Sequence, residues 1–372
     1  MSNKKIVRYN IDNLANEDAT INIVYGERSN GKSYQLKHKM AVLKYLETGS
    51  RFILMRRWKE EITTEKIEAY FADVDIIKIT NGKYNCITCY RKTLYLSNYY
   101  LESGKTIRGE KIGYVVALST EQNYAGASYL DVSDIIFEEF MSRSEYIGGE
   151  SDKLMNFYST VDRKRGTTKL WLVGNSISRV CPYLVDWDLS SMIRTLKQGE
   201  IKTKFLPTNT FDDNGKEIMV KLAIEHAPET GRTSFAIGKH RDMLNKGSWQ
   251  TDPQPHLPKS KKCYNSVFKI IFYYKSFKFL GELLVDKEEN KNICWFISPF
   301  TKEIKDNILV FSDVVKISPY WQRDIYNPII NNDNIRKLLM TFKENMIFYA
   351  TDLCGTDFKQ AIDFEIKKWY IK

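Results

Sequence analysis

Short apolar runs alternate with amphipathic stretches through the first half of the chain. Residues 33–46 and 58–71 have the spacing of helices with one apolar face. Residues 75–80 and the alternating stretch 84–96 are predicted to be strands, with a turn at Asn81-Gly82. Strands that alternate with helices predict an α/β fold with a mostly parallel sheet and helices on both faces. Further apolar runs predict strands at 21–25, 51–55, 114–118, 134–137 and 169–173.

The pattern changes in the last third of the chain. Residues 247–261 are polar and contain three prolines, a composition typical of a linker. We therefore predict an α/β domain at 1–210, a linker region at 211–261 and a smaller α/β domain at 262–372. In the last of these, the pattern predicts three antiparallel strands at 267–274, 277–285 and 293–297, a helix at 334–344, a strand at 346–350 and a closing helix at 357–370.

The composition is that of a globular protein with an excess of positive charge. Hydrophobic residues make up 43% of the chain and charged residues 27%. No apolar run approaches the roughly 18 residues that a membrane-spanning helix needs, so we expect no membrane contact. The formal net charge of +10 is spread along the chain. Such a spread charge is compatible with a protein that binds a polyanion over an extended surface, or with a basic protein that binds none.

The strongest chemical signal is an octapeptide that follows one predicted strand and precedes a predicted helix. It reads Gly26, Glu27, Arg28, Ser29, Asn30, Gly31, Lys32, Ser33, and it fits the P-loop pattern G-x-x-x-x-G-K-[ST]. Backbone N–H groups of such a loop bind the phosphates of ATP. We expect the Lys32 ammonium to reach the β- and γ-phosphates and the Ser33 hydroxyl to bind Mg²⁺. A glycine-rich turn with a chance Lys-Ser pair is the alternative.

Two further signals follow buried strands. Glu138 and Glu139 end the apolar strand 134–137, which predicts the acidic partner of a P-loop: Glu138 as the Mg²⁺-side carboxylate and Glu139 as the group that polarises the attacking water. Aspartate is usual at the first position, so the extra methylene of Glu138 leaves the metal geometry open. Asn175, after the strand 169–173, lies where a side chain that senses the γ-phosphate is expected. A solvated strand end is the alternative for each.

A basic cluster lies some way beyond the acidic pair. Arg163 and Arg165 follow the segment Thr160-Val-Asp. An arginine at this place can reach the γ-phosphate of a neighbouring subunit. A solvated basic helix end is the alternative, and the sequence alone favours it.

Together these motifs resemble the DNA-packaging ATPases of small, protein-primed tailed phages, the phi-29-type encapsidation proteins. The resemblance covers nearly the whole chain. Besides the P-loop, it lies in the stretches 52–59 (FILMRRWK), 135–140 (IIFEEF), 160–163 (TVDR) and 175–178 (NSIS). It implies an ASCE-type P-loop ATPase domain followed by an RNase H-like domain of the kind found in large terminases.

The resemblance also implies roles for single residues and for the whole assembly. Arg56 takes the position of the lid arginine, Glu139 that of the catalytic glutamate, and Arg163 that of an arginine finger acting in trans across a ring of five subunits. The implied protein is a motor that couples ATP hydrolysis to translocation of double-stranded DNA into a procapsid. It would work in the host cytoplasm, transiently at the portal vertex of the procapsid.

The C-terminal domain leaves an alternative open. An active nuclease of the RNase H-like fold needs a cluster of acids that bind two metals. The strand 267–274 contains no acid, and Asp352, before the last predicted helix, is a candidate. We therefore interpret the domain as a vestigial nuclease. The alternatives are a large-terminase-type ATPase with an active nuclease, or a generic DNA helicase or translocase.

Candidate DNA contacts are basic residues outside these motifs. Lys105, Arg108 and Lys111, predicted to lie in a loop, and Arg143 offer cations to a phosphate backbone. Residues 120–127 are polar and rich in small side chains, which predicts a mobile loop. Ordinary surface charge is the alternative for the basic residues.

Overall fold

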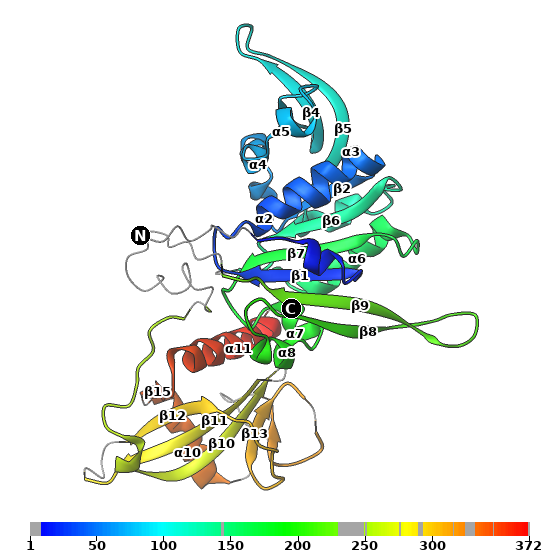
Figure 1. The fold of residues 1–372 in the computed structure, drawn as a ribbon. Helices are drawn as coiled ribbons and strands as arrows, with labels where there is room; N and C mark the ends of the chain where they lie inside the picture. The colour runs from blue at the N-terminus through cyan, green and yellow to red at the C-terminus, as the bar shows by residue number, and fades with distance from the viewer. Residues whose placement is uncertain are drawn as a thin grey trace. The chain divides into compact units, whose positions relative to one another are not determined.

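The computed structural model describes residues 9–142, 145–229, 249, 251–274, 277–288, 293–314, 316–323, 332–344 and 346–370. The chain divides into two compact units (Figure 1). The first unit comprises Met1–Ile177 and Thr195–Ser248, and the second comprises Ser178–Arg194 and Trp249–Lys372. No helix in the described part of the chain is both long enough and apolar enough to cross a membrane.

Nine strands among the described residues form the sheet of the first unit: β1 (Ile21–Gly26), β2 (Arg51–Arg56), β3 (Cys86–Tyr90), β4 (Thr93–Tyr100), β5 (Lys105–Ala117), β6 (Val132–Glu138), β7 (Lys169–Asn175), β8 (Ile201–Phe211) and β9 (Glu217–His226). Their order is β3-β4-β5-β2-β6-β7-β1-β9-β8. The pairings from β5 through to β9 are parallel. Antiparallel pairings close both edges. The predicted mostly parallel sheet is confirmed.

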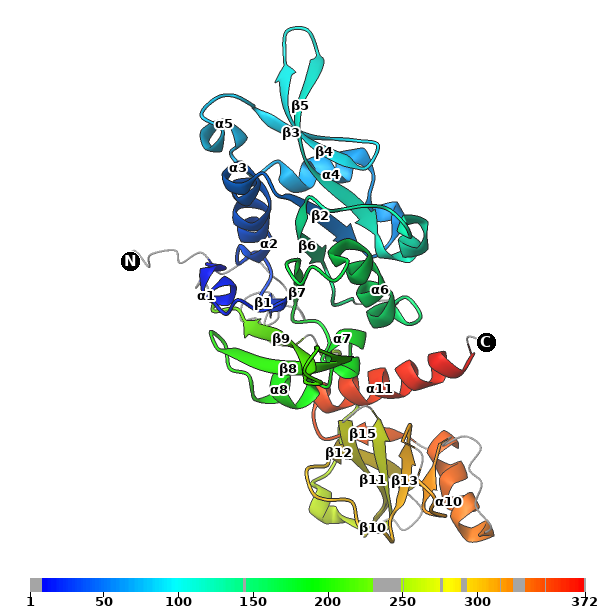
Figure 2. The same ribbon diagram turned by 90° about the vertical axis from the view of Figure 1, so that its right-hand side faces the viewer.

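Helices cover both faces of this sheet. Figure 2 shows the helical segment 32–48 on one side of β2, β6 and β7, and α6 on the other. The helical elements are α1 (Asp12–Ala15), α2 (Lys32–Gln35), the π-helical η1 (Leu36–Leu43), α3 (Lys44–Thr48), η2 (Lys59–Glu61), α4 (Thr64–Phe71), α5 (Ile76–Ile79), η3 (Leu118–Tyr124) and α6 (Glu150–Asp162). α2, η1 and α3 follow one another without a break and form the helical segment 32–48.

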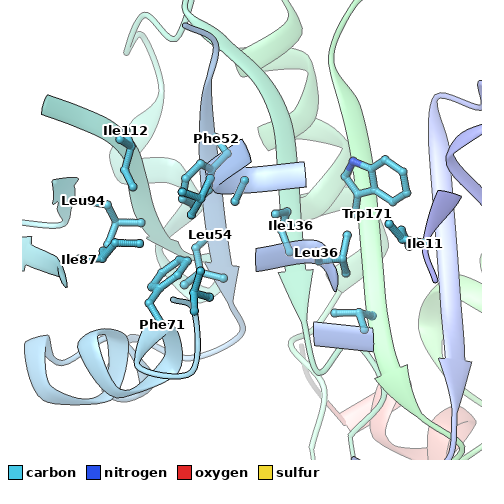
Figure 3. Packing of buried hydrophobic residues seen from close by; sticks show 14 of the residues in the cluster. Ile11, Leu36, Phe52, Leu54, Phe71, Ile87, Leu94, Ile112, Ile136 and Trp171 are labelled. Atoms are coloured by element: carbon cyan, nitrogen blue, oxygen red, sulfur yellow. The ribbon is translucent and has the colours of Figure 1, made fainter. Parts of the chain in front are cut away.

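The central strands are continuous apolar runs because both of their faces are covered. All six residues of β1 are buried. On one face, Phe52 and Leu54 of β2 meet Phe71 of α4, and Ile136 and Trp171 belong to the same core cluster (Figure 3). This packing fixes the ends of β1, β2, β6 and β7 relative to one another, and the candidate residues lie at those ends.

Four predictions for the first unit were wrong. The predicted strand 75–80 instead contains the helix α5, because the Asp75 side chain accepts a hydrogen bond from the backbone N–H of Lys78 and caps that helix. The predicted basic loop at 105–111 is part of β5. Residues 120–124 of the predicted mobile loop 120–127 belong to η3. The predicted linker 211–261 contains β9, whose parallel pairing with β1 makes it part of the sheet.

The second unit has a six-stranded sheet among its described residues: β10 (Tyr264–Tyr274), β11 (Phe277–Asp286), β12 (Ile293–Pro299), β13 (Leu309–Ser312), β14 (Trp321–Gln322) and β15 (Ile347–Tyr349), in the order β14-β13-β10-β11-β12-β15. The strands β10, β11 and β12 pair antiparallel, as predicted. Parallel strands flank them on either side. The helical elements are α7 (Pro182–Asp186), α8 (Ser190–Thr195), η4 (Lys261–Cys263), α10 (Asp333–Glu344) and α11 (Asp352–Tyr370).

Candidate functional site

The loop 26–33 leaves the buried strand β1 and enters helix α2. It turns at Gly31, whose φ of 99° lies in the left-handed region that favours glycine. Lys32 Nζ donates hydrogen bonds to Glu27 O at 2.6 Å and to Asn30 Oδ1 at 3.1 Å. Burial lowers the pKa of Lys32 to about 8, although the carboxylates of Glu138 and Glu27 act in the opposite direction. The loop therefore holds a buried cation at the start of a helical segment, where phosphate groups bind favourably.

Two buried hydrogen-bond donors, one in this loop and one next to it, bear on whether the loop can bind a polyphosphate. Asn30 Nδ2 and Ser176 Oγ have no hydrogen-bond partner among the described residues. Ser176 N donates to Gly26 O at 3.1 Å, so this serine lies next to the loop. A buried donor without a partner costs about 1–3 kcal/mol, and phosphate oxygens would remove that cost. The donor set fits the phosphates of ATP. Arg28 and Ser29 are exposed at the loop.

The loop meets the end of β6 through Glu138. Ser33 Oγ donates to Glu138 Oε2 at 2.9 Å, and Tyr70 of α4 donates to Oε1 at 2.5 Å. Burial raises the pKa of Glu138, while the two hydroxyl groups lower it by a smaller amount. Hydroxyl and carboxylate oxygens are the ligands that Mg²⁺ prefers, so this pair fits the metal. The glutamate carboxylate, one methylene longer than that of aspartate, reaches the Ser33 hydroxyl.

Glu139 and Arg56 come together at the same edge of the sheet. Arg56 Nη2 lies 3.0 Å from Glu139 Oε2, and Arg56 Nε lies 3.4 Å from Glu61 Oε2. Glu139 has a left-handed backbone, with φ of 57°. Its side chain is 62% exposed, which leaves the carboxylate open to water. Asn175, at the end of β7, pairs in register with Gly26 and so lies beside the start of the loop.

Arg163 and Arg165 differ in how their guanidinium groups are held. Arg163 follows α6 with φ of 47° and is exposed, and its Nη2 donates to Gly126 O at 3.4 Å and Ala127 O at 2.9 Å. Arg165 is fixed by the backbone around it. Its guanidinium donates to the carbonyl oxygens of Asp162, Leu130, Tyr129, Val132 and Val161 and to Thr168 Oγ1. Arg163 is therefore the arginine whose side chain is available to another molecule.

The candidate DNA contacts lie away from the loop 26–33. Lys105, Arg108 and Lys111 are on β5, in the long β4–β5 hairpin that projects from the sheet (Figure 1). Three strands, β2, β6 and β7, separate β5 from β1. The Arg108 guanidinium lies 4.2 Å from the ring centroid of Tyr90, and the Lys111 ammonium 4.1 Å from that of Tyr114. Arg143 lies outside the described residues.

Sequence reasoning missed two residues of the site. Tyr70 donates to Glu138 from a helix far away in sequence, and no motif marks it. Arg57 is almost completely buried, and it donates to the carbonyl oxygens of Glu139 and Phe140. The sequence marked Arg57 only by its position after Arg56 in the stretch RRWK, at the end of a buried strand.

The described residues of the second unit hold no comparable cluster. Asp352 begins α11 and accepts hydrogen bonds from Gln254 N at 2.9 Å and contacts His256 Nε2 at 2.9 Å. β10 contains no acidic residue. Across the described residues, no three His, Cys, Asp or Glu side chains are grouped so that they could hold a metal ion.

Comparisons with known proteins agree on one family. The family model described as "Podovirus DNA encapsidation protein (Gp16)" matches residues 3–354. The chain is 25% identical to the DNA packaging protein of Bacillus phage PZA over 357 residues, which cover 91% of this chain and 92% of that protein. It is 26% identical to the DNA packaging protein of Bacillus phage phi29 over 280 residues, 72% of this chain and 74% of that one.

A solved structure shares the fold. A chain of the bacteriophage Phi-29 viral genome packaging motor assembly matches with a TM-score of 0.57 at 22% identity. The match covers 97% of this chain and 98% of that chain. At this identity the match supports the fold alone.

Proposed function

The chain belongs to the family of podovirus DNA encapsidation proteins, so its function is viral DNA packaging, and we propose that ATP hydrolysis at the loop 26–33 drives the DNA. The observation that carries the proposal is the hydrogen bond between Ser33 and Glu138, 105 residues apart. It joins the P-loop to the acidic end of β6, with Glu139 and Arg56 alongside. This is the set of groups that phosphoryl transfer requires.

We assign the chemistry to residues as follows. Lys32 and the loop N–H groups bind and orient the phosphates. Mg²⁺, held by Ser33 and Glu138, would neutralise charge on the β- and γ-phosphates. Glu139 would accept the proton of the water that attacks the γ-phosphorus as the bond to the ADP oxygen breaks. Arg56 holds the Glu139 carboxylate by its ion pair.

The assembly is the second part of the proposal. We propose a homo-oligomeric ring of five subunits at the portal vertex of the procapsid, in the host cytoplasm, with Arg163 acting on the neighbour's nucleotide. The exposure of Arg163 and the weak hold on its guanidinium support this role. The hydrogen bonds that hold the Arg165 guanidinium against its own backbone argue against that residue as the finger.

The DNA contacts and the second unit complete the proposal. The projecting β4–β5 hairpin carries Lys105, Arg108 and Lys111, and we propose that it contacts the phosphate backbone of double-stranded DNA without reading sequence. We assign the second unit to a vestigial RNase H-like domain that binds partners. The acid-free strand β10 supports the loss of nuclease activity.

Steady-state ATP hydrolysis with and without double-stranded DNA tests the proposed function. Lys32→Ala should abolish turnover, because the phosphates lose their main cationic partner. Lys39→Ala is the matched control: this lysine lies on the same helical segment and pairs with Asp12. It should keep wild-type turnover. Equal activity of the Lys32→Ala variant and the wild type would exclude the loop as the site of hydrolysis.

Glu139→Gln separates binding from chemistry. The amide should keep ATP binding and slow hydrolysis by orders of magnitude, because it cannot accept the proton. A fluorescent ATP analogue measures binding, and phosphate release measures hydrolysis. Near-normal hydrolysis by this variant would assign the base to Glu138 or another group.

A further inference from the structure

A buried ion pair stands directly behind the proposed catalytic glutamate. Arg57 is 4% exposed and Glu150 1% exposed. Arg57 Nε donates to both carboxylate oxygens of Glu150, at 2.9 and 3.0 Å, and Arg57 Nη2 donates to Oε1 at 2.9 Å. Ile147 N also donates to Glu150 Oε2 at 2.8 Å. The carboxylate therefore fixes the guanidinium in one orientation.

The other edge of this guanidinium holds the backbone of the catalytic residue. Arg57 Nη1 donates to Glu139 O at 3.1 Å, and Nη2 donates to Phe140 O at 2.6 Å. Glu139 has φ of 57°, a conformation that is unfavourable for a non-glycine residue and persists only where the surroundings enforce it. Phe140, the residue after Glu139, is fully buried, and its backbone N–H donates a hydrogen bond to Val173 O at 3.3 Å. This bond anchors the backbone directly after Glu139. The left-handed turn at Glu139 is thus held by Arg57.

Arg56 is the last residue of β2 and Arg57 follows it directly, and the two arginines bind different parts of Glu139. Arg56 pairs with the carboxylate of Glu139, while Arg57 binds its carbonyl oxygen. The carboxylate is thus aimed from one side and its backbone fixed from the other.

We propose that Arg57 and Glu150 are positioning residues that set the direction of the Glu139 carboxylate toward the attacking water. The inference rests on the proposed function. Arg57 acts through its hydrogen bonds to the backbone, and Glu150 acts through Arg57. A misplacement of about 1 Å at a catalytic group can cost roughly 10²-fold in rate, so the loss of this clamp should appear in turnover and not in ATP binding.

Glu150→Gln tests the proposal, with Asp134→Asn as its matched control. Asp134 is a second fully buried carboxylate of the first unit, held by Lys44 Nζ at 2.6 Å and Trp171 Nε1 at 2.8 Å. Both variants replace a buried, paired carboxylate by its amide. Measured below both melting temperatures, Glu150→Gln should lower kcat by about 10- to 100-fold and change the ATP dissociation constant by less than about twofold. Asp134→Asn should keep wild-type kcat.

A double variant shows whether the effect passes through Glu139. In the Glu139→Gln background the carboxylate is already lost, so Glu150→Gln should cause no further loss in single-turnover hydrolysis. A role in stability alone would lower the rate in both backgrounds. Arg57→Lys is the second route, because one ammonium cannot keep the two-pronged contact with Glu150 and also reach both carbonyls. It should reproduce the kcat loss with unchanged ATP binding.

The outcomes separate the inference from the function beneath it. If the Lys32→Ala variant hydrolyses ATP as fast as the wild type, the proposed function is wrong. If the wild type hydrolyses ATP through Lys32, normal kcat in both Glu150→Gln and Arg57→Lys would overturn the positioning role alone. An equal loss of kcat in Asp134→Asn would also overturn the positioning role. So would a further loss of rate when Glu150→Gln is added to the Glu139→Gln variant.

Discussion

Glu138 of the first unit differs from two buried carboxylates of the second unit in the partners that hold it. In the first unit, Glu138 receives hydrogen bonds from the hydroxyl groups of Ser33 and Tyr70, and burial raises its pKa. In the second unit, Glu282 is paired with Lys261 and Lys269, and Asp357 is paired with Arg179. A carboxylate beside a lysine or arginine already has its counter-charge. Of these three carboxylates, Glu138 would gain most from a metal ion, which supports the proposed site in the first unit.

The same contrast separates the two arginines after α6. Arg165 donates to six acceptors and is part of the fold, whereas Arg163 makes two contacts to one exposed loop. Residue type did not separate these two residues in the sequence. The number of hydrogen bonds that each guanidinium makes does separate them. It predicts that replacing Arg163 lowers turnover, whereas replacing Arg165 lowers stability.

The largest effect should come from Arg163→Ala. An arginine supplied in trans contributes about 10³–10⁵ in rate, so turnover should fall by about that factor while the melting temperature stays unchanged. Arg165→Ala should instead cost roughly 2–3 kcal/mol of stability through its lost backbone contacts. ATPase assays and thermal denaturation of both variants check this. The reverse pattern would assign the finger to Arg165.

Glu138→Gln should lower turnover by roughly 10²-fold or more at saturating ATP, because the neutral amide is a weaker ligand for Mg²⁺. Glu282→Gln is the control from the second unit. It should leave turnover unchanged and cost roughly 1–3 kcal/mol of stability by removing a charged hydrogen-bond acceptor. Mg²⁺ titrations of ATPase activity measure the difference. Equal losses of turnover in both variants would remove the distinction between the two carboxylates.

A smaller effect concerns pH. Lys32, with a pKa of about 8, loses its proton as the pH rises through that value, and the neutral amine no longer attracts phosphate. If ATP binds the charged form, its apparent affinity should fall by about tenfold between pH 7 and pH 9. Arginine stays charged over this range, so Lys32→Arg should bind ATP without that change. A flat profile for the wild type would mean that burial does not lower this pKa.

The smallest effect is expected in the second unit. Asp352→Ala should leave ATP turnover unchanged, because this aspartate contacts His256 and the backbone of Gln254 within its own unit. Neither the wild type nor the variant should nick plasmid DNA in Mn²⁺. Nicking by the wild type that the variant lacks would favour the alternative of a terminase with an active nuclease.

Most strands of the first unit could be predicted because buried parallel strands are continuous apolar runs between turns. The failures have local causes. Asp75 caps a helix that its apolar residues alone do not distinguish from a strand. β9 follows a turn at 212–215 and pairs with β1, nearly 200 residues earlier, so a window of neighbouring residues does not reveal it. The linker prediction failed there for this reason.

The P-loop and the acidic pair could be predicted because each is a contiguous motif. The residues that support them could not. Tyr70 reaches Glu138 from α4, and Glu150 reaches Arg57 across 93 residues. Such contacts depend on how strands and helices pack. In the sequence, Tyr70 and Glu150 look no different from tyrosines and glutamates on the surface. The family resemblance already favoured Arg163 over Arg165, and the hydrogen bonds of the two guanidinium groups add a physical reason for that choice.

Mixed rings test the central claim, that Glu139 and a neighbour's Arg163 complete one ATPase site. Arg163→Ala and Glu139→Gln subunits, each inactive alone, are mixed, and ATP hydrolysis is measured against the mixing ratio, with mixed assembly verified by mass. Some interfaces then join an intact Glu139 to an intact Arg163 of the neighbour. We predict recovery of activity that is greatest at intermediate ratios. No recovery in verified mixed rings would contradict the claim and place both residues in the same subunit's site.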